Sequence, residues 1–540
     1  MKYIFVSGGV ISGIGKGTTA ASIAFLLKSA GYKIAPIKFE NYLNLDAGTI
    51  NPIEHGDPFL CEDGTEADMD IGTYEKFLDE DMGKANFVTM GRIYQSVIDR
   101  ERRFEYNGED VEAIPHLTNE ITDRINQVGK LNKADIVIIE LGGTAGEYQN
   151  VFYYEASRIM TLQNPGDVLH IHVSYVPTPA HLGEPKTKPT QLSVRTLNSL
   201  GIQPDFVITR SEKYLDQRRR ERFALFCNMK PEDIISNPDL KSVYEIPLVL
   251  HKQGIEEKIL KKLGLKLKSP DLKDWEKLVE KIKSKKSKEV EIAIVGKYFE
   301  TGDYQLRDSY AALLDAIDHA SFNIGVSVKT KWIDAEKVEK EGVEIVGLPD
   351  GLIVPIGWGE RGAEGMIAAA SYARERKIPY LGLCYGMQLA VIGFARDKLG
   401  WADANTTEND KNTKHPVIHL MPKQKKFMQK RAYGGTMRLG SWDAVVAKGT
   451  RAYEIYKKEL TSERHRHRYE FNNEYIKDFE NNGLVISARS VKENLVEIIE
   501  LPEKAHPFYM ATQGHPEYKS RPLKPHPLFL AFIEAVSKIN

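Results

Sequence analysis

The chain has 540 residues, too many for one ordinary hydrophobic core, so two or more domains are expected. Its 74 basic and 75 acidic residues give a formal net charge of −1, which offers no electrostatic case for nucleic-acid or membrane binding. Three scattered cysteines, the lack of a secretory signal and the lack of any apolar run near ~18 residues favour a soluble, cytoplasmic protein.

The first motif is the glycine-rich stretch 7–19, Ser-Gly-Gly-Val-Ile-Ser-Gly-Ile-Gly-Lys-Gly-Thr-Thr. It follows an apolar strand, Tyr3–Val6, and leads into a helical pattern, Thr18–Ala30. Strand, glycine turn, lysine and helix together are typical of a phosphate-binding loop, in which Lys16 reaches the terminal phosphates. The strict P-loop spacing is not met, and the alternative is a glycine-rich turn with a surface lysine.

Strands and helices alternate through the first half of the chain, which predicts a doubly wound, mostly parallel sheet. Functional loops of such a sheet lie at the carboxyl ends of its strands, where Lys38 and Glu140 fall. The further strands are expected at Lys33–Phe39, Asp135–Glu140, Val168–Val173 and Asp205–Thr209.

Acidic residues are frequent between Asp57 and Asp81. A solvated loop would account for them. The second interpretation is a magnesium site, in which Asp70 and Glu140 hold a hard cation against nucleotide phosphates. The nearby phosphate-binding loop favours magnesium.

The stretch Lys186–Gln191 combines two lysines with hydrogen-bonding side chains beside a proline that breaks a helix. A phosphate-binding loop and a solvated turn remain equally open.

Residues 263–288 are rich in lysine with Trp275 as their one aromatic residue, which favours a solvated helix and linker over a nucleic-acid patch. We therefore expect one domain over 1–266, a linker over 267–289 and a second domain over 290–540.

The second half contains another α/β series. Its predicted strands are Val290–Gly296, Val326–Ile333, Gly351–Pro355, Pro379–Leu383 and Phe508–Gln513, and its predicted helices are Asp308–Ala320, Gly365–Arg376 and Met387–Arg396. The turn after the fourth strand reads Gly-Leu-Cys-Tyr-Gly, a nucleophile elbow with Cys384 in place of serine. The alternative is a buried apolar cysteine.

A cysteine nucleophile needs a base and a group that orients the base. His515 and Glu517, in Gly-His-Pro-Glu after a predicted strand, offer both. The two histidines of Arg464–Tyr469 compete for the role of base, although their arginine-rich context suits carboxylate or phosphate recognition better. Backbone N–H groups near Gly357 and after Cys384 are candidates for an oxyanion hole. An ATP-dependent half joined to a thiol amidohydrolase-like half suggests glutamine hydrolysis that supplies ammonia to an activated acceptor.

The chain resembles the CTP synthase family, a P-loop amidoligase domain followed by a class I glutamine amidotransferase domain. The resemblance rests on the glycine-rich stretch and on further motifs in the family's order, namely Asn51-Pro-Ile-Glu-His-Gly, 61–72, Glu140-Leu-Gly-Gly-Thr-Ala-Gly, Lys186–Gln191, Tyr433–Gly440, Arg464-His-Arg-His-Arg-Tyr-Glu and His515-Pro-Glu. It implies two doubly wound α/β domains and a reaction in which ATP phosphorylates UTP at O4 and ammonia displaces that phosphate to give CTP.

The resemblance also implies roles for single residues. ATP would be bound by Gly13, Ile14, Gly15, Lys16, Gly17, Thr18, Lys38 and Asp70, with Mg²⁺ on Asp70 and Glu140. UTP and CTP would be bound by Ser12, Glu147, Tyr148, Gln149, Lys186, Thr187, Lys188, Pro189, Thr190, Gln191 and Arg222. Glutamine would be bound by Gly357, Tyr385, Gly386, Met387, Gln388, Glu408 and Arg468, and attacked by Cys384 with His515 and Glu517. His55 would gate the ammonia exit.

The family is activated by GTP through the lid-like stretch Tyr433–Gly440, is inhibited by CTP and assembles as a tetramer from dimers; filaments are left open. Two departures concern nucleotide binding. The sequence has Glu147-Tyr-Gln where the family usually has Asp-x-Glu, which puts CTP feedback in question, and Arg222 where lysine is common.

Three further departures flank the glutaminase centre. Ile356 replaces a glycine beside the expected oxyanion hole, Tyr385 replaces a leucine and Gly514 replaces an aromatic residue. A β-branched residue disfavours positive φ, so the loop at Ile356 must shift or carry strain if the family's backbone needs that conformation. We interpret these changes as a divergent but working glutaminase. The alternatives are a related amidoligase that acts on a carboxylate, and a nucleotide-binding scaffold whose glutaminase has decayed.

Overall fold

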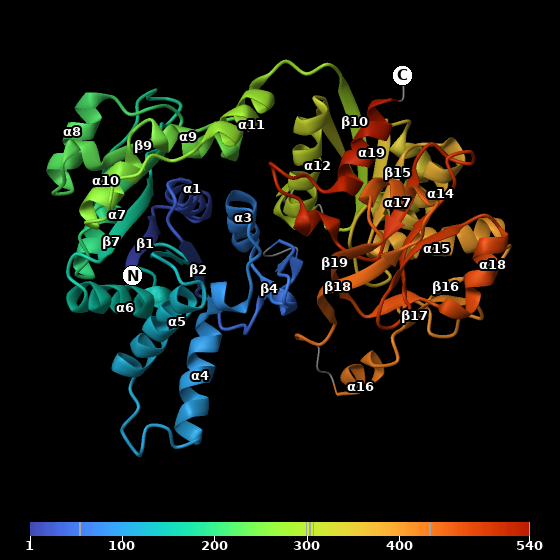
Figure 1. The fold of residues 1–540 in the computed structure, drawn as a ribbon, viewed down its shortest axis with the longest axis horizontal. Coiled ribbons are helices and arrows are strands. Elements are labelled where there is room, and N and C mark those ends of the chain that lie inside the picture. Colours follow the sequence, from blue (N-terminus) through green and yellow to red (C-terminus); the bar gives the residue numbers. More distant parts are fainter. Residues whose placement is uncertain (53–55, 299, 302–303, 306, 431–433, 539–540) are drawn as a thin grey trace. The chain divides into compact units, whose positions relative to one another are not determined.

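The computed structural model describes residues 1–52, 56–298, 300–301, 304–305, 307–430 and 434–538. It divides into two compact units. Figure 1 colours the chain from blue at the N-terminus to red at the C-terminus. The first comprises Met1–Asp46 and Asp70–Val279, and the second comprises Ala47–Met69 and Glu280–Asn540. The break near residue 279 falls inside the lysine-rich segment, within helix α11, Lys273–Lys283. Trp275 is buried there, and its indole N–H donates to the Tyr244 carbonyl.

The first unit is built on a seven-stranded sheet in which every pairing is parallel, in the order β5-β2-β6-β1-β7-β8-β9. The prediction of a parallel doubly wound sheet is therefore confirmed. Helix α1 (Lys16–Ser29) lies on one face, and helices α5 (Thr118–Leu131) and α6 (Val151–Gln163) lie on the other (Figure 1). The strands are β1 (Lys2–Gly9), β2 (Ile34–Glu40), β5 (Phe87–Thr89), β6 (Ile136–Leu141), β7 (Val168–Tyr175), β8 (Phe206–Ser211) and β9 (Ile234–Pro238).

These strands form because they are short apolar runs that can be buried on both faces of a parallel sheet. In β6 all six residues are buried, and in β7 seven of eight are. The helices of this unit are α1 (Lys16–Ser29), α3 (Met69–Leu78, its first residue in the second unit), α4 (Met90–Arg102), α5 (Thr118–Leu131), α6 (Val151–Gln163), α7 (Lys188–Ser199), α8 (Gln217–Phe226), α9 (Ile246–His251), α10 (Ile255–Lys262) and α11.

The second unit contains a nine-stranded mixed sheet, in the order β13-β10-β14-β15-β23-β22-β21-β18-β19. The pairings from β13 to β23 are parallel, and those from β23 to β19 are antiparallel. The strands are β10 (Glu289–Gly296), β13 (Ser327–Asp334), β14 (Gly351–Val354), β15 (Tyr380–Leu383), β18 (Arg438–Val446), β19 (Leu460–His467), β21 (Val485–Ser490), β22 (Val496–Glu500) and β23 (Tyr509–Thr512).

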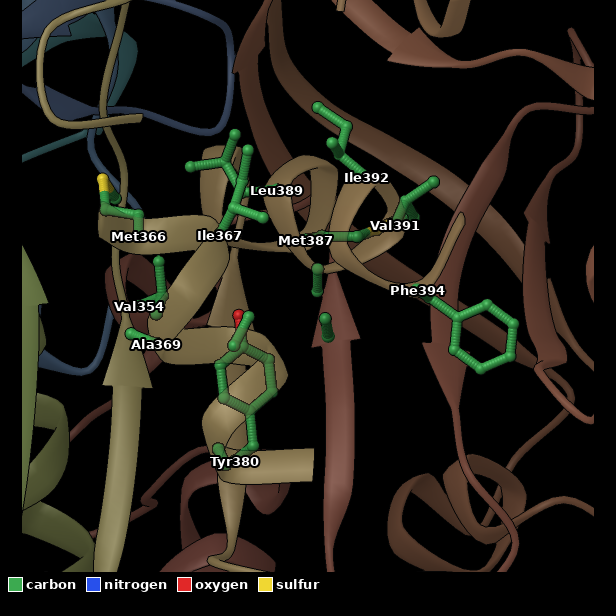
Figure 2. Close-up of a cluster of buried hydrophobic side chains, with 14 of the residues drawn as sticks. Val354, Met366, Ile367, Ala369, Tyr380, Met387, Leu389, Val391, Ile392 and Phe394 are labelled. Atoms are coloured by element: carbon green, nitrogen blue, oxygen red, sulfur yellow. The ribbon is translucent and has the colours of Figure 1, made fainter. Parts of the chain in front are cut away.

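Hydrophobic side chains fill both faces of this sheet. Figure 2 shows one of the two clusters, in which residues from the helices Ala363–Arg376 and Tyr385–Lys398 pack with the neighbouring strands. The helices of the unit are α12 (Ala311–Ile324), α13 (Ala335–Glu341), α14 (Ala363–Arg376), α15 (Tyr385–Lys398), α16 (Gln424–Gln429), α17 (Arg451–Tyr456), α18 (Ile476–Asn481) and α19 (Pro527–Ser537). Short strands lie outside the main sheet, namely β3 (Phe59–Leu60), β4 (Glu66–Ala67), β11 (Glu300–Thr301), β12 (Tyr304–Gln305), β16 (Asn405–Thr406), β17 (Pro416–Leu420) and β20 (Tyr469–Phe471).

The predicted strands of both halves correspond to β1, β2, β6, β7, β8, β10, β13, β14, β15 and β23. The antiparallel strands β18, β19, β21 and β22 were not identified from the sequence. Within the described part of the chain, no helix is both long enough and apolar enough to span a membrane.

Candidate active sites

The glycine-rich stretch forms the turn between β1 and α1, as its pattern predicts. Gly13 and Gly15 have φ of +67° and +89°, a left-handed conformation that other residues rarely adopt. Gly8 provides room for the lysine, because a Cβ there would lie 2.6 Å from Lys16 Cδ. Lys16 is the first residue of α1, so a phosphate at its side chain would also face the positive end of a 14-residue helix.

Lys16 is only 8 % exposed and its Nζ donates to the Gly143 carbonyl at 2.8 Å. Burial lowers its pKa, and the positive charge of Lys38 adds to that effect. Gly17 allows the start of α1 to approach an acidic side chain, since a Cβ there would lie 2.3 Å from Asp70 Oδ1. The loop, the lysine and this carboxylate therefore lie together.

A buried charge cluster occupies the ends of β2 and β6. Lys38 and Glu140 are opposite each other in the parallel register, and the Lys38 ammonium donates to Glu140 Oε1 at 2.6 Å. It also donates to Asp70 Oδ2 at 2.8 Å and lies 3.0 Å from Glu40 Oε1. Tyr74 donates its hydroxyl to Glu140 Oε2 at 2.9 Å.

The cluster has shifted proton affinities. Burial raises the pKa of Glu140, against the opposing charge of Lys38. Burial also opposes ionisation of Asp70, but Lys38 outweighs it and the pKa of Asp70 is lowered. Asp70 and Glu140, two of the three carboxylates around the Lys38 ammonium, are hard oxygen donors of the kind that Mg²⁺ takes together with phosphate oxygens. The residues present therefore fit the expected magnesium ion, although no group of three or more metal-binding side chains occurs among the described residues.

The stretch Lys186–Gln191 differs from the expected loop. Its second half is the first turn of α7, which begins at Lys188 and carries Pro189 near its start. Proline is tolerated in a first turn because the N–H that it lacks has no helical partner there, so here it starts a helix instead of breaking one. Lys186 pairs with Glu184, Thr190 Oγ1 donates to the Tyr175 carbonyl, and Gln191 Nε2 donates to Thr187 Oγ1.

The other expected nucleotide residues lie on loops or exposed surfaces. Ser12 is exposed in the glycine-rich turn, and Arg222 is exposed on α8 with its guanidinium over the Phe226 ring. Glu147 stands where the family usually has the aspartate of Asp-x-Glu. Its carboxylate accepts hydrogen bonds from the Thr144 N–H and hydroxyl and from Asn41 Nδ2. Tyr148 is 97 % exposed and Gln149 is also exposed. His55, the expected ammonia gate, and Tyr433, at the start of the expected lid, lie outside the described residues.

In the second unit, Cys384 lies at the turn between β15 and α15, as the elbow predicts. Its φ of 51° and ψ of −99° are unusual for a residue with a side chain, and strain of this kind is typical of nucleophile elbows. The flanking glycines are required by close packing. A Cβ at Gly386 would lie 2.0 Å from the Val354 carbonyl oxygen, and one at Gly382 would lie 2.9 Å from Ala511 Cβ.

His515 and Glu517 form the expected base and orienting group. His515 Nδ1 lies 2.7 Å from Glu517 Oε1, and both side chains are buried. The opposite ring nitrogen, Nε2, is buried and has no hydrogen-bond partner among the described residues. Burial would lower the pKa of His515, but the charge of Glu517, followed by that of Cys384, outweighs this effect, and the pKa is raised to about 10. Glu517 therefore stabilises the protonated form of the His515 imidazole.

The competing histidines serve a different purpose. His465 and His467 lie in β19 within hydrogen-bond distance of the Arg438 guanidinium, at 3.3 and 3.2 Å. Arg438 in turn donates to Glu497 Oε1 at 2.6 Å. Burial, followed by the charge of Arg438, lowers the pKa of both histidines well below the usual range. They belong to a buried polar network, and His515 is the base candidate that the geometry supports.

The loop after β14 is held by three side chains. Glu408 Oε1 accepts from the Gly359 N–H at 2.9 Å, and Tyr385 donates its hydroxyl to the Gly359 carbonyl at 2.8 Å. Lys297 donates to the Trp358 carbonyl at 2.9 Å, and its ammonium lies 4.5 Å from the centre of the Tyr385 ring. Burial lowers the pKa of Lys297 to about 8. Lys297 was not predicted as a site residue, although it follows strand β10 directly and its strand-end position could have identified it.

Ile356 carries no backbone strain from a positive φ. In its loop, positive φ occurs at Gly359 and Gly362 and not at Ile356. Ile356 is 3 % exposed and its carbonyl accepts from the Tyr310 hydroxyl at 3.2 Å. Gly514 is also explained by packing, because a Cβ there would lie 2.7 Å from Glu463 Cβ.

The remaining expected glutamine residues surround the elbow. Gly357, Gly386 and Met387 are buried, and Gln388 Nε2 donates to the Tyr469 carbonyl at 2.8 Å. Arg468 donates through Nη2 to Thr436 Oγ1 at 2.9 Å and through Nη1 to Gln424. The guanidinium is thus bound to side chains of α16 and of the segment before β18.

Segment 47–69 is held by the arginines of β19. Arg466 Nε donates to Glu66 Oε1 at 2.6 Å, and Arg464 Nε donates to Glu62 Oε2 at 3.0 Å. The arginine-rich context favoured carboxylate or phosphate recognition, and the partners that the structure shows for Arg464 and Arg466 are these two carboxylates. Glu62 and Glu66 belong to the acidic stretch between Asp57 and Asp81, and the solvated-loop interpretation is wrong for these two residues, because arginines of the second unit bind them.

Comparison with known proteins gives two family matches in this chain. Residues 2–265 match the family model for the CTP synthase N-terminus, and residues 305–535 match the model for class I glutamine amidotransferases. A CTP synthase of Caldanaerobacter subterraneus is 51 % identical over 100 % of this chain and 99 % of its own length. One of Pyrococcus abyssi is 48 % identical over 99 % and 98 %. The solved glutaminase domain of Trypanosoma brucei CTPS with bound acivicin is 36 % identical over 46 % of this chain and 95 % of its own, with a TM-score of 0.42.

Matches at this identity over the whole chain favour the resemblance stated above over a carboxylate-amidating relative. The chain belongs to the CTP synthase family, whose members are glutamine-hydrolysing ligases that convert UTP to CTP.

Proposed function

We propose that the second unit hydrolyses glutamine at Cys384 and that the first unit uses ATP to activate UTP for attack by the ammonia released. The observation that carries this proposal is the arrangement of Cys384, His515 and Glu517, with the cysteine on a strained elbow and the histidine bound to the glutamate. This arrangement also argues against a scaffold with a decayed glutaminase.

In the glutaminase, the Cys384 thiolate attacks the amide carbon of glutamine and forms a glutamyl thioester. His515 holds the proton that the Cys384 thiol gave up and delivers it to the nitrogen that leaves as ammonia, and Glu517 holds the imidazole through Nδ1. Backbone N–H groups at Gly357 and Tyr385 stabilise the oxyanion. Arg468 and Glu408 bind the charged end of glutamine, for which Arg468 exchanges its contacts with Thr436 and Gln424.

In the first unit, the loop Gly13–Thr18 with Lys16 holds the ATP phosphates. Lys38 keeps the carboxylates of Asp70 and Glu140 in place beside them. A Mg²⁺ ion bound by these carboxylates would supply neutralising charge as the phosphoryl group moves from ATP to O4 of UTP. Ammonia then replaces the phosphate at C4.

The N-terminus of α7 and the lysines around it suit an anionic nucleotide, so we assign the UTP phosphates to this end of the helix. The residues proposed for UTP or CTP are Ser12, Glu147, Tyr148, Gln149, Lys186, Thr187, Lys188, Pro189, Thr190, Gln191 and Arg222. His55 is proposed as the gate through which ammonia leaves.

Further properties follow from family membership and are proposed for this chain. GTP activates the enzyme, CTP inhibits it, and the functional assembly is a tetramer built as a dimer of dimers. The domains are 1–266 and 290–540, joined by 267–289. The three cysteines are buried and form no disulfide with one another, which suits the reducing cytoplasm.

A covalent trap at the nucleophile tests the proposal. A glutamine-like electrophile should modify Cys384 and leave Cys61 and Cys227 unmodified, which peptide mass spectrometry distinguishes within one sample. His515→Ala should slow the modification strongly, because the thiolate then lacks its counterion. An unreactive Cys384 in the presence of UTP, ATP, Mg²⁺ and GTP would contradict the proposal.

A further inference from the structure

The imidazole of His515 has a second neighbour besides Glu517. The Tyr518 ring stacks on it, with ring centroids 5.2 Å apart and an interplanar angle of 29°. His515 is completely buried and Tyr518 is 2 % exposed. Glu517 fixes the ring within its plane through Nδ1, and Tyr518 limits its tilt from one face. The orientation of His515 therefore depends on where Tyr518 is held.

Residues 57–59 hold Tyr518 from the other side. Its hydroxyl donates to Asp57 Oδ2 at 2.9 Å and lies 3.1 Å from the Pro58 carbonyl oxygen. The Phe59 ring packs edge-on against the Tyr518 ring, with centroids 5.2 Å apart at 73°. A buried tyrosine with both its hydroxyl and its ring engaged has one orientation.

Asp57 is itself fixed near the catalytic centre. Arg466 Nη1 lies 3.6 Å from Asp57 Oδ1, while the carbonyl oxygen of Arg466 lies 3.9 Å from Cys384 Sγ. Burial raises the pKa of Asp57, against the charges of Arg466 and His515. One cavity is lined by Asp57, Glu517 and Tyr518 among other residues. Asp57 and Tyr518 thus border the same space as Glu517, the partner of the base.

We propose that Asp57 and Tyr518 are positioning residues of the glutaminase, which hold the His515 imidazole in line with Cys384. The inference rests on the proposed role of His515 as base. His515 Nε2 must face the thiol in one step and the leaving nitrogen in the next, and a misplacement near 1 Å can cost about 100-fold in rate. Residues 57–59 belong to the stretch that matches the CTP synthase N-terminal model, so this sequence serves the glutaminase as well.

Tyr518→Phe tests the anchor and keeps the stacked ring. We expect kcat for glutamine hydrolysis to fall roughly 10-fold, while KM for glutamine stays within a factor of about two because the hydroxyl does not reach the substrate. CTP formation from ammonium should be unchanged. Tyr509→Phe is the matched control, since it removes another buried hydroxyl of the same unit, which donates to the Ala370 carbonyl at 3.3 Å.

Two changes at Asp57 separate positioning from packing. Asp57→Ala removes the acceptor and should reproduce the loss in kcat seen with Tyr518→Phe. Asp57→Asn keeps an acceptor oxygen at the same place and should recover most of the rate. The double variant Asp57→Ala with Tyr518→Phe should lose little more than either single variant, because both remove one hydrogen bond. Cooperative thermal unfolding checks that each variant is folded.

A wild-type kcat in folded Tyr518→Phe would overturn the inference. So would a loss of kcat that Asp57→Asn does not recover, or an equal loss of glutamine- and ammonium-dependent synthesis. His515→Ala distinguishes a failure of the proposed base from a failure of the proposed positioning role. If His515→Ala retains full glutaminase activity, the proposed base is wrong; if it is inactive while Tyr518→Phe is normal, only the positioning role is wrong.

Discussion

Lys38 and Glu140 stand opposite each other on β2 and β6, and the ammonium of one donates to the carboxylate of the other at 2.6 Å. Both side chains are almost completely buried, at 3 % and 1 % exposure. Because the same ammonium also binds Asp70 and Glu40, one cation holds three carboxylates at the carboxyl ends of a parallel sheet.

Lys38→Met should therefore destabilise the first unit. Burial opposes the charge of Lys38, yet the three carboxylates raise its pKa well above the usual value, so the ammonium is retained. Its removal leaves buried negative charge without a partner, which costs about 3–5 kcal/mol. Chemical denaturation measures the loss, and added Mg²⁺ should restore part of it. Lys33→Met, at an exposed position just before the same strand, is the control; equal stability of the two variants would contradict the cluster's role.

Lys16→Ala should abolish CTP synthesis from both ammonium and glutamine, because the phosphates of ATP lose their point charge at the start of α1. Glutamine hydrolysis by Cys384 uses no group of the first unit in our proposal, so trapping of Cys384 should persist. CTP synthesis is measured as the amount of CTP formed, and the reactivity of Cys384 is measured as the fraction of its thiol that is modified. Full CTP synthesis by Lys16→Ala would remove the glycine-rich loop from the mechanism.

The stability of the protein should respond to the titration of His515. Its pKa is raised from 6.5 to about 10, so the folded state holds this proton more tightly than the unfolded state. The resulting stabilisation is complete below about pH 6.5 and is lost as pH rises toward about 10, at up to about 1.4 kcal/mol per unit. The variant His515→Gln lacks this stabilisation because glutamine does not bind the proton. The difference in unfolding free energy between wild type and variant should therefore shrink from pH 7 to 10. If the unfolding free energies of the two proteins change with pH in parallel, His515 is not held as an imidazolium in the folded state.

Tyr385→Phe tests the loop that carries Gly357. The hydroxyl of Tyr385 donates to the Gly359 carbonyl and accepts from Asn409 Nδ2 at 3.1 Å. Loss of one such pair is expected to cost about 1 kcal/mol in transition-state stabilisation, or roughly 5-fold in kcat/KM for glutamine. Steady-state glutaminase kinetics measure the change. An unchanged kcat/KM would mean that the contacts of Glu408 and Lys297 suffice to fix the loop.

Much of this arrangement was predictable from local patterns. Short apolar runs located the parallel strands, and glycines at fixed offsets located the turns at Lys16 and Cys384. Strand-end placement also brought Lys38 and Glu140 to one edge, as observed.

The antiparallel half of the second sheet was not predictable in this way. Strand β19 ends in Arg-His-Arg-His, a charged run that is typical of an exposed loop but is buried here. It is buried because Glu62 and Glu66, about 400 positions earlier in the chain, neutralise Arg464 and Arg466. Pairing at that sequence distance leaves no local periodicity, and the contact of Tyr518 with Asp57 was missed for the same reason.

The most direct test of the account compares wild type with Cys384→Ala in CTP formation from UTP, ATP and Mg²⁺. Each protein is assayed with ammonium and, separately, with glutamine plus GTP. We predict CTP from both nitrogen sources in the wild type and from ammonium alone in the variant, because Cys384 only supplies ammonia. Glutamine-dependent CTP from Cys384→Ala, or the loss of both activities in the folded variant, would contradict the division of labour between the two halves of the chain.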